Sequence, residues 1–257
     1  MQPTLVLIHG IGQDKQAWQF LDLGEIGGAE VQRFEIPGHG QTPRQPGMTW
    51  TLLADQLVTQ YSGLLDLVSV GAPGEIVLSA LVRHPERIRS AVVFAGGRLG
   101  VEGVSDGVRT ERTRRADDAL ANGMASFVDE VITRWFGTSA DTPAKAYART
   151  TLLRMDPRAW ADAQYADLLG QPATPAQLSK VTQPVTLVGV RMEQPARAIN
   201  GTDASFSQHS VECASRLHAL MKGSRLVEST GGAMIHLTNP DVCLRAIKDH
   251  LDWVGRR

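Results

Sequence analysis

Short apolar runs alternate along this chain with segments whose apolar residues recur at helical spacing. Six runs rich in Val, Ile and Leu predict strands, over Thr4–Ile8, Val31–Ile36, Leu65–Val70, Arg89–Phe94, Val185–Val190 and Arg225–Ser229. Helical spacing covers Asp55–Leu65, continues from Gly71 to about Val82, and covers Pro240–Trp253. This alternation predicts an α/β protein with a parallel sheet, right-handed crossovers and helices on both faces. Ligands of such sheets bind beyond the carboxyl ends of the strands.

The strand pattern stops between Arg98 and Lys180. Helical spacing dominates there and is broken at one glycine and four prolines, namely Gly137, Pro143, Pro157, Pro172 and Pro175. We interpret residues 98–180 as an inserted helical cap, and residues 1–97 and 181–257 as the core that carries the sheet. The cap is expected to cover the strand ends.

Composition and charge exclude several classes of protein. With 26 Lys and Arg against 27 Asp and Glu, the net charge is −1, so neither nucleic acid nor an anionic membrane is expected as a partner. The longest early apolar run, Leu5–Ile8, is too short for a signal-peptide core or a membrane span. Two cysteines, Cys213 and Cys243, do not make a disulfide framework and indicate buried, reduced thiols. We therefore expect a cytoplasmic protein.

Five motifs follow one another in order outside the cap. They are Leu5-Val6-Leu7-Ile8-His9-Gly10, Ile36-Pro37-Gly38-His39-Gly40-Gln41-Thr42, Arg83-His84-Pro85-Glu86-Arg87-Ile88, Val185-Thr186-Leu187-Val188-Gly189 and the segment from Gly232 to Pro240. In order and spacing they resemble the α/β-hydrolase fold, and the resemblance covers most of the chain outside the cap. It implies a mostly parallel sheet flanked by helices, and a Ser-His-acid triad for catalysis.

The positions at which this fold carries its triad hold other residues here. The nucleophile belongs on a Gly-x-Ser-x-Gly turn after a strand, and the matching residue is Gly71. The position of the histidine holds Ala233, and that of the acid holds Met192, next to Glu193. Because the members of a triad act as a unit, their joint loss argues against a Ser-His-Asp relay. Gly71 also has a structural explanation, since glycine relieves the backbone strain of such a turn.

Two other residues are candidates for a relocated hydrolytic site. Ser69 becomes the nucleophile if the turn begins two residues earlier, although it then lies within a predicted strand. His236 replaces the missing base in this interpretation, although the resemblance makes it a packing residue at the start of a helix. With Glu193 they define one alternative function, an ester, lactone or amide hydrolase with relocated catalytic residues.

Backbone groups do not depend on side-chain identity, so an oxyanion hole can persist without the triad. The resemblance assigns its two N–H groups to Ile11 and Ala72. Such a pair stabilises an enolate as well as a tetrahedral adduct. This favours proton transfer beside a carbonyl, as in epimerisation, isomerisation or ring closure.

Several side chains near the strand ends and in the cap are candidates for the lining of a capped, mostly apolar ligand site. They are His9, Trp135, Phe136, Tyr147, Trp160, Tyr165 and Met234. For the aromatic residues the alternative is that they form the core of the cap. The sequence contains no metal-ligand cluster, phosphate-binding loop or Gly-x-Gly-x-x-Gly motif, so no metal, nucleotide or other cofactor is expected.

The chain is also similar to atypical α/β-hydrolase-fold proteins from natural-product biosynthesis that lack the triad, such as the aspartate epimerase of bottromycin biosynthesis. The similarity implies a peptide substrate whose own carboxylate acts as base, while the protein supplies shape and an oxyanion site. We therefore expect a non-hydrolytic epimerase, isomerase or cyclase that acts on a peptide or small natural-product intermediate under the cap. A second alternative is a pseudoenzyme that binds such a ligand without turnover.

Overall fold

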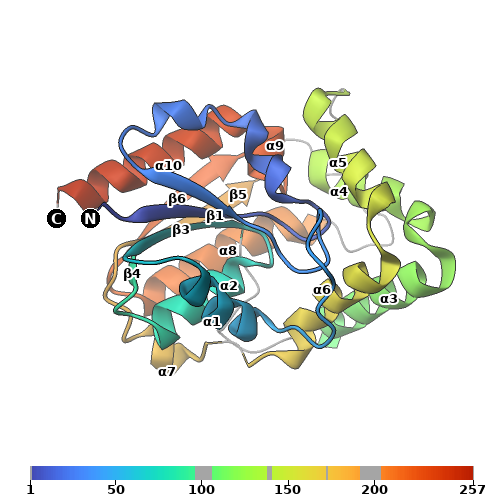
Figure 1. Ribbon diagram of the computed structural model, residues 1–257, viewed down its shortest axis with the longest axis horizontal. Coiled ribbons are helices and arrows are strands. Elements are labelled where there is room, and N and C mark those ends of the chain that lie inside the picture. Colours follow the sequence, from blue (N-terminus) through green and yellow to red (C-terminus); the bar gives the residue numbers. More distant parts are fainter. Residues whose placement is uncertain (1, 96–105, 138–140, 172, 192–203, 257) are drawn as a thin grey trace.

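Within the described residues, six parallel strands form one sheet at the centre of the protein (Figure 1). The computed structural model describes residues 2–95, 106–137, 141–171, 173–191 and 204–256. The strands are β1 (Thr4–Ile8), β2 (Glu30–Phe34), β3 (Leu65–Val70), β4 (Ile88–Phe94), β5 (Val185–Arg191) and β6 (Ser224–Thr230). Their order is β2-β1-β3-β4-β5-β6, and every neighbouring pair is parallel. The sequence prediction of a parallel sheet is confirmed.

Helices cover both faces of the sheet, which explains why its central strands are apolar without alternation. Figure 1 shows α10 (Pro240–Gly255) on one face, and α1 (Trp50–Gln60), α2 (Gly74–Arg83) and α8 (Ala204–Leu220) on the other. All six positions of β3 are buried between these layers. Apolar side chains of the sheet and the helices form one continuous core.

Some predicted element bounds are wrong. The helix predicted over Asp55–Leu65 is α1, which begins earlier because the Thr49 side chain accepts a hydrogen bond from the amide of Leu52. It also ends earlier, and Gly63 then turns the chain with a φ of +74° before Leu65 begins β3. Local spacing alone did not separate the last helical turn from the strand that follows it.

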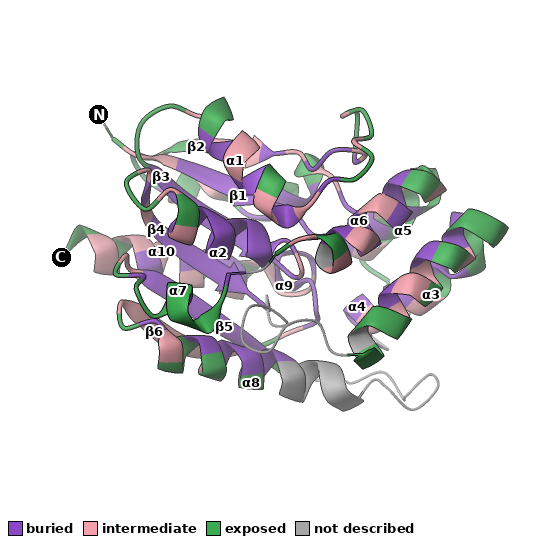
Figure 2. Cartoon of the chain, turned by 90° about the horizontal axis from the view of Figure 1, so that it is seen from below, coloured by how far each residue is buried: buried purple, intermediate pink, exposed green. Residues whose placement is uncertain are grey.

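Four helices, α3 (Asp106–Asn122), α4 (Val128–Phe136), α5 (Pro143–Arg154) and α6 (Pro157–Leu169), lie together beyond the carboxyl ends of the strands (Figure 1). Among them α3 packs against α6, and α4 against α5. Figure 2 shows both buried and exposed positions along α3, α5 and α6. The short helix α7 (Pro175–Leu178) packs against α2 and α8, so by its contacts it lies with the core.

Three of the prolines that interrupt the helical spacing mark helix starts. Pro143, Pro157 and Pro175 lie in the first turns of α5, α6 and α7. Proline suits this position because it lacks an N–H and its φ is already helical. Each follows a residue whose side chain accepts a hydrogen bond from the first turn, namely Thr142, Asp156 and Thr174.

The structure also bears on the membrane and disulfide expectations. No helix in the described ranges combines the length and the apolar character that crossing a bilayer requires. Cys213 and Cys243 are both buried thiols, as the sequence indicates.

Candidate oxyanion site

The turn between β3 and α2 is the sharp corner at which the sequence resemblance places a nucleophile. Gly71 lies at its apex with a φ of +72°, a left-handed conformation that favours glycine. Its N–H donates to the carbonyl of Phe94 (2.9 Å), and its own carbonyl accepts from the N–H of Gly74 (3.0 Å). A Cβ at Gly71 would lie 3.4 Å from the methyl carbon of Met234. The apex therefore has no side chain and faces the end of a thioether.

Ser69, the alternative nucleophile, lies inside β3 and not at the apex. It pairs in register with Ile8 of β1 and Val93 of β4, and it is fully buried. Its hydroxyl has no hydrogen-bond partner among the residues that the structure describes. A hydroxyl enclosed in the sheet is not presented at the strand ends, so this geometry argues against Ser69 as a nucleophile.

The loop of residues 9–14 that follows β1 is here called the β1 loop. Three of its backbone N–H groups donate to acceptors in the loop itself or on His39. The N–H of Gly10 donates to Oε1 of Gln13 (3.1 Å), and that of Gly12 donates to Nε2 of His39 (3.1 Å). The N–H of Gln13 donates to the carbonyl of Gly10 (3.3 Å). For Ile11 no hydrogen-bond acceptor is found among the described residues. Among the residues described, the Ile11 N–H is thus an amide of this loop without a protein acceptor.

The first amide beyond the apex, that of Ala72, likewise has no acceptor within the described part of the chain. Strands β1 and β3 are neighbours, and Ile8 lies opposite Ser69. Ile11 and Ala72 follow these paired residues by the same number of positions, so their amides lie on adjacent loops at one edge of the sheet. Two N–H groups arranged in this way can stabilise an oxygen atom that carries negative charge.

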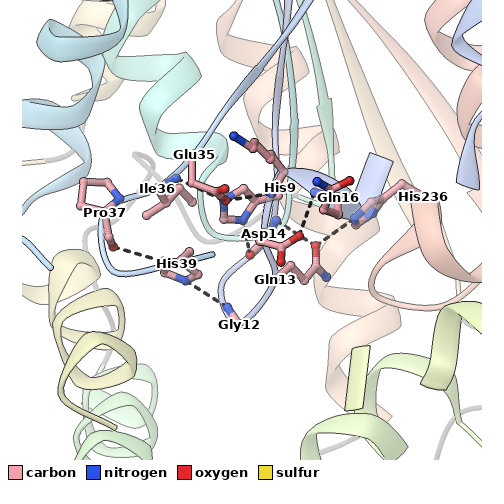
Figure 3. A network of polar contacts seen from close by, with 12 residues as sticks. His9, Gly12, Gln13, Asp14, Gln16, Glu35, Ile36, Pro37, His39 and His236 are labelled. Atoms are coloured by element: carbon pink, nitrogen blue, oxygen red, sulfur yellow. Dashed lines mark hydrogen bonds and ion pairs between the residues drawn. The ribbon is translucent and has the colours of Figure 1, made fainter. Parts of the chain in front are cut away.

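His39 holds the β1 loop as a neutral imidazole (Figure 3). Because its Nε2 accepts the Gly12 N–H, its proton is on Nδ1, which donates to the carbonyl of Pro37 (3.2 Å). Burial, and then the proximity of His9, lower the pKa of His39 to about 3. A neutral ring keeps a lone pair aimed at Gly12 and fixes the residue next to Ile11.

His9, the first residue of the β1 loop and proposed from the sequence as a lining residue, is fully buried. Its Nδ1 donates to the carbonyl of Gly10 (2.9 Å). The N–H of Ile36 (3.1 Å) and the carboxylate of Glu35 (3.0 Å) both approach its Nε2. Strand β2 ends at Phe34, which pairs with Ile8 at the end of β1, so it ends earlier than predicted. His9 therefore ties the β1 loop to the chain that follows β2.

His236, the alternative base, is hydrogen-bonded to the β1 loop (Figure 3). Its Nε2 donates to Oε1 of Gln13 (2.9 Å), the same oxygen that accepts the Gly10 N–H. Its ring packs against Trp18 with 4.7 Å between the ring centroids and an angle of 36° between the ring planes. Burial, and then His9, lower its pKa to about 3. These contacts make His236 a buried, neutral residue that orients Gln13.

The chain from Gly232 to Met234 places apolar groups where the fold carries its catalytic imidazole. Ala233 is buried and contributes only a methyl group. The sulfur of Met234 lies 2.9 Å from the position that a Cβ of Gly10 would take, and its methyl carbon lies 3.4 Å from the corresponding position at Gly71. The thioether therefore spans the space between the β1 loop and the turn after β3.

The cap contacts the β1 loop directly at Gly12. A Cβ at this glycine would lie 2.6 Å from Leu152, 2.9 Å from Trp160 and 3.4 Å from Trp135. Trp160 also packs against Phe127 within the cap, with ring centroids 5.3 Å apart. The two tryptophans thus serve the packing of the cap and also lie against the loop that carries Ile11.

Of the other aromatic candidates, Tyr147 also reaches the β1 loop. Its hydroxyl donates to Oδ1 of Asp14 (2.7 Å) and accepts the N–H of the same residue (3.3 Å). Burial and the adjacent carboxylate raise the pKa of Tyr147. Phe136 is buried at the end of α4. Tyr165 bonds to Asp117 on the cap, away from the loop.

Some expectations lie outside the structure, and some residues of the site were not predicted. Met192 and Glu193 lie outside the described residues. In the described ranges, no group of three or more His, Cys, Asp or Glu side chains is arranged to hold a metal ion. Two residues that were not proposed as site residues hold amides of the β1 loop. They are Gln13, which belongs to the loop, and His39, which lies outside it. His39 belongs to the motif Ile36–Thr42, but a motif does not tell which backbone amide a side chain will meet.

Comparisons with known proteins agree with this geometry at the level of the fold. No family model and no curated protein sequence matches the chain. Among solved structures, an enol-lactonase from Burkholderia xenovorans LB400 superposes with a TM-score of 0.78 at 17% identity, over 98% of this chain and 92% of that one. A thermophilic esterase from Thermogutta terrifontis gives 0.81 at 18% identity over the same shares of the two chains.

A third structure extends the likeness to another enzyme. MenH from S. aureus superposes with a TM-score of 0.79 at 17% identity, over 98% of this chain and 94% of that one. At these identities the likeness concerns the fold alone. The chain has the α/β-hydrolase fold.

Proposed function

We propose that this protein is a non-hydrolytic enzyme that transfers a proton beside the carbonyl of a peptide or small molecule. Its ligand places a carbonyl or carboxylate oxygen against the amides of Ile11 and Ala72. The observation that carries the proposal is that these two N–H groups have no acceptor among the described residues, while Gly71 beside them has no side chain. The proposal thus places an oxygen site next to the apex that lacks a nucleophilic side chain.

Hydrolysis through an acyl-enzyme needs a nucleophile and a base that the described site does not offer. Gly71 has nothing to attack with, and Ala233 holds a methyl group in the position of the imidazole. His236 has its Nε2 proton engaged by Gln13. An oxyanion site without these groups still lowers the energy of an enolate, whose charge is on the oxygen.

The proposed reaction needs no covalent intermediate. A base removes the proton from the carbon next to the carbonyl, and the electron pair moves to the oxygen held by Ile11 and Ala72. Return of the proton to the opposite face, or to another carbon, gives an epimer or an isomer. In this proposal the base is a carboxylate of the substrate itself. The esterase and lactonase of the same fold act on carbonyl compounds according to their names, which fits this substrate class.

Nuclear magnetic resonance of the amide groups tests the oxygen site directly. Titration of the ¹⁵N-labelled protein with sodium acetate is expected to shift the Ile11 and Ala72 resonances, because the carboxylate accepts hydrogen bonds from both. The amides of Gly10 and Gly12 are internal controls, since Gln13 and His39 already occupy them. If acetate leaves Ile11 and Ala72 unchanged up to saturating concentrations, the proposal is wrong.

Turnover is tested in deuterium oxide with amidated dipeptides that contain Asp or Glu. Mass spectrometry is expected to show incorporation of one deuteron at a carbon next to a carbonyl, with the peptide bond intact. Cleaved peptide would instead support the relocated hydrolase. Ligand binding at Ile11 and Ala72 without deuterium uptake would support the pseudoenzyme that binds without turnover.

A further inference from the structure

We propose that Met234 sets the size of the group that a ligand can place next to its bound carbonyl. The inference rests on the proposed function and names the residue that selects among its substrates. Met234 follows directly after Ala233, and its side chain reaches back across the oxyanion site.

The contacts of the thioether place it beside both amides. Its sulfur meets Gly10, the residue before Ile11, and its methyl carbon meets Gly71, the residue before Ala72. An oxygen bound by both amides therefore brings the carbon that carries it close to the Met234 side chain. Substituents on that carbon have to share the space with the thioether.

The backbone of Met234 is held in place, so the position of its side chain is defined. Its carbonyl accepts from the amides of Leu237 (2.8 Å) and Thr238 (3.0 Å). The Thr238 hydroxyl in turn accepts the N–H of Gly232 (2.9 Å). Gly10 leaves space for the sulfur, because a Cβ there would lie only 2.9 Å from it. The backbone hydrogen bonds fix where the Met234 side chain begins, and the missing Cβ at Gly10 leaves the space that its sulfur occupies.

A thioether limits size without competing for the ligand's oxygen. It has no hydrogen-bond donor and only a weak acceptor, so it does not replace the two N–H groups. It is flexible, but it occupies volume wherever it rotates. The site consequently favours carbonyl and carboxylate compounds with a small substituent at the neighbouring carbon. Replacing Met234 by alanine removes the three atoms beyond Cβ and opens that space.

Binding of a homologous series tests this role. Acetate, propionate and butyrate are titrated against the wild type, Met234→Ala and Met234→Leu, with the Ile11 and Ala72 amides as the readout. The ratio of butyrate to acetate affinity is expected to rise at least about tenfold in Met234→Ala, because each buried methylene contributes roughly a factor of four. Met234→Leu keeps three atoms beyond Cβ and is expected to keep the ratio within about threefold of the wild type.

A second measurement needs no substitution in the site. In protein labelled at the methionine methyl groups, butyrate is expected to shift the Met234 resonance and to leave those of Met48 and Met221, both buried elsewhere in the core, unchanged. The two hypotheses fail in different ways. If no carboxylate shifts the Ile11 and Ala72 amides, the oxyanion site is wrong. If the amides shift but the Met234 methyl does not, or the affinity ratio stays the same in Met234→Ala, the role of Met234 is wrong.

Discussion

Single residues decide whether this site can break an ester bond, and Gly71 is the first of them. A left-handed φ costs an L-residue about 1–2 kcal/mol, so the turn itself favours glycine whatever the chemistry. In an enzyme with a nucleophile at this apex, the strain is accepted because the hydroxyl is needed. Here the strain is absent and so is the hydroxyl, and Met234 approaches the position that a side chain would take.

Restoring the hydroxyl alone is expected to destabilise the protein without creating an esterase. Gly71→Ser should lower the free energy of unfolding by about 1–2 kcal/mol, measured by urea denaturation, because of its φ of +72°. Gly71→Ala carries the same strain without a hydroxyl and is the matched control. Hydrolysis of p-nitrophenyl acetate should be equal in the two variants. Turnover more than tenfold faster with serine than with alanine would reveal a base within reach of the apex.

The residues of the site divide into those that a motif locates and those that only the folded chain brings together. Gly71 and Ala233 could be placed from the sequence because each belongs to a short motif with a fixed position on the sheet. The bond between His236 and Gln13 joins positions 223 residues apart, and nothing local indicates it. Met234 was proposed as a lining residue, but its contacts with Gly10 and Gly71 depend on tertiary structure.

At the scale of elements, glycines in the core loops allow the helices of the cap to approach closely. Gly12 lies against side chains of α4, α5 and α6, and a Cβ at Gly38 would lie 2.6 Å from Cβ of Ala159 in α6. At Gly232 such an atom would lie 2.1 Å from the carbonyl oxygen of Trp135 in α4. The helices approach the core loops at three points where a side chain would hold them away.

This docking is tested by adding one methyl group. Gly38→Ala is expected to lower the free energy of unfolding by about 1–3 kcal/mol more than Gly47→Ala, because a Cβ at Gly38 would overpack against Ala159. The two glycines have φ angles of +79° and +73°, but at Gly47 a Cβ meets nothing within 4 Å. Backbone strain therefore cancels in the comparison by urea denaturation. Equal losses in the two variants would show that α6 does not depend on close approach at Gly38.

The elements were more predictable than their ends. β1 and β3 have the predicted bounds because a continuous apolar run has clear limits. The start of α1 was missed because it depends on the N-capping side chain of Thr49. The spacing of hydrophobic residues does not indicate where such a cap forms. In the cap, the sequence showed breaks in the helical spacing, and two of its prolines, Pro143 and Pro157, proved to begin α5 and α6. The sequence did not show that Leu152 and Trp160 would meet at Gly12.

At the scale of the whole molecule, three buried histidines link folding to pH. Burial is the first cause that lowers the pKa of His39, His236 and His250 from 6.5 to about 3. His39 and His236 brace the β1 loop, whereas His250 lies on α10, where it bonds to the hydroxyl of Thr186 (2.7 Å). The same neutral form of imidazole thus supports the β1 loop at one end of the sheet and the packing of α10 elsewhere.

Acid is therefore expected to destabilise the protein well above the range in which carboxylates titrate. Between pH 6.5 and 3 the unfolded chain binds protons at these imidazoles and the folded chain does not, so stability falls as the pH falls below 6.5. Each histidine contributes up to about 1.4 kcal/mol per pH unit, and all three together roughly 4. Asp55, whose pKa Arg83 lowers from 3.8, loses its contribution only at lower pH.

Substitution of one histidine isolates its part of this slope. His39→Gln retains an acceptor for the Gly12 N–H but binds no proton, so the loss of unfolding free energy between pH 6.5 and 5 should shrink by about 1 kcal/mol per pH unit. The wild-type protein, measured in parallel, is the reference for this slope. Urea denaturation at a series of pH values measures both. An unchanged slope in His39→Gln would mean that the His39 ring is already protonated on both nitrogens in the folded protein, and Gly12 would then lack the acceptor that fixes the loop beside Ile11.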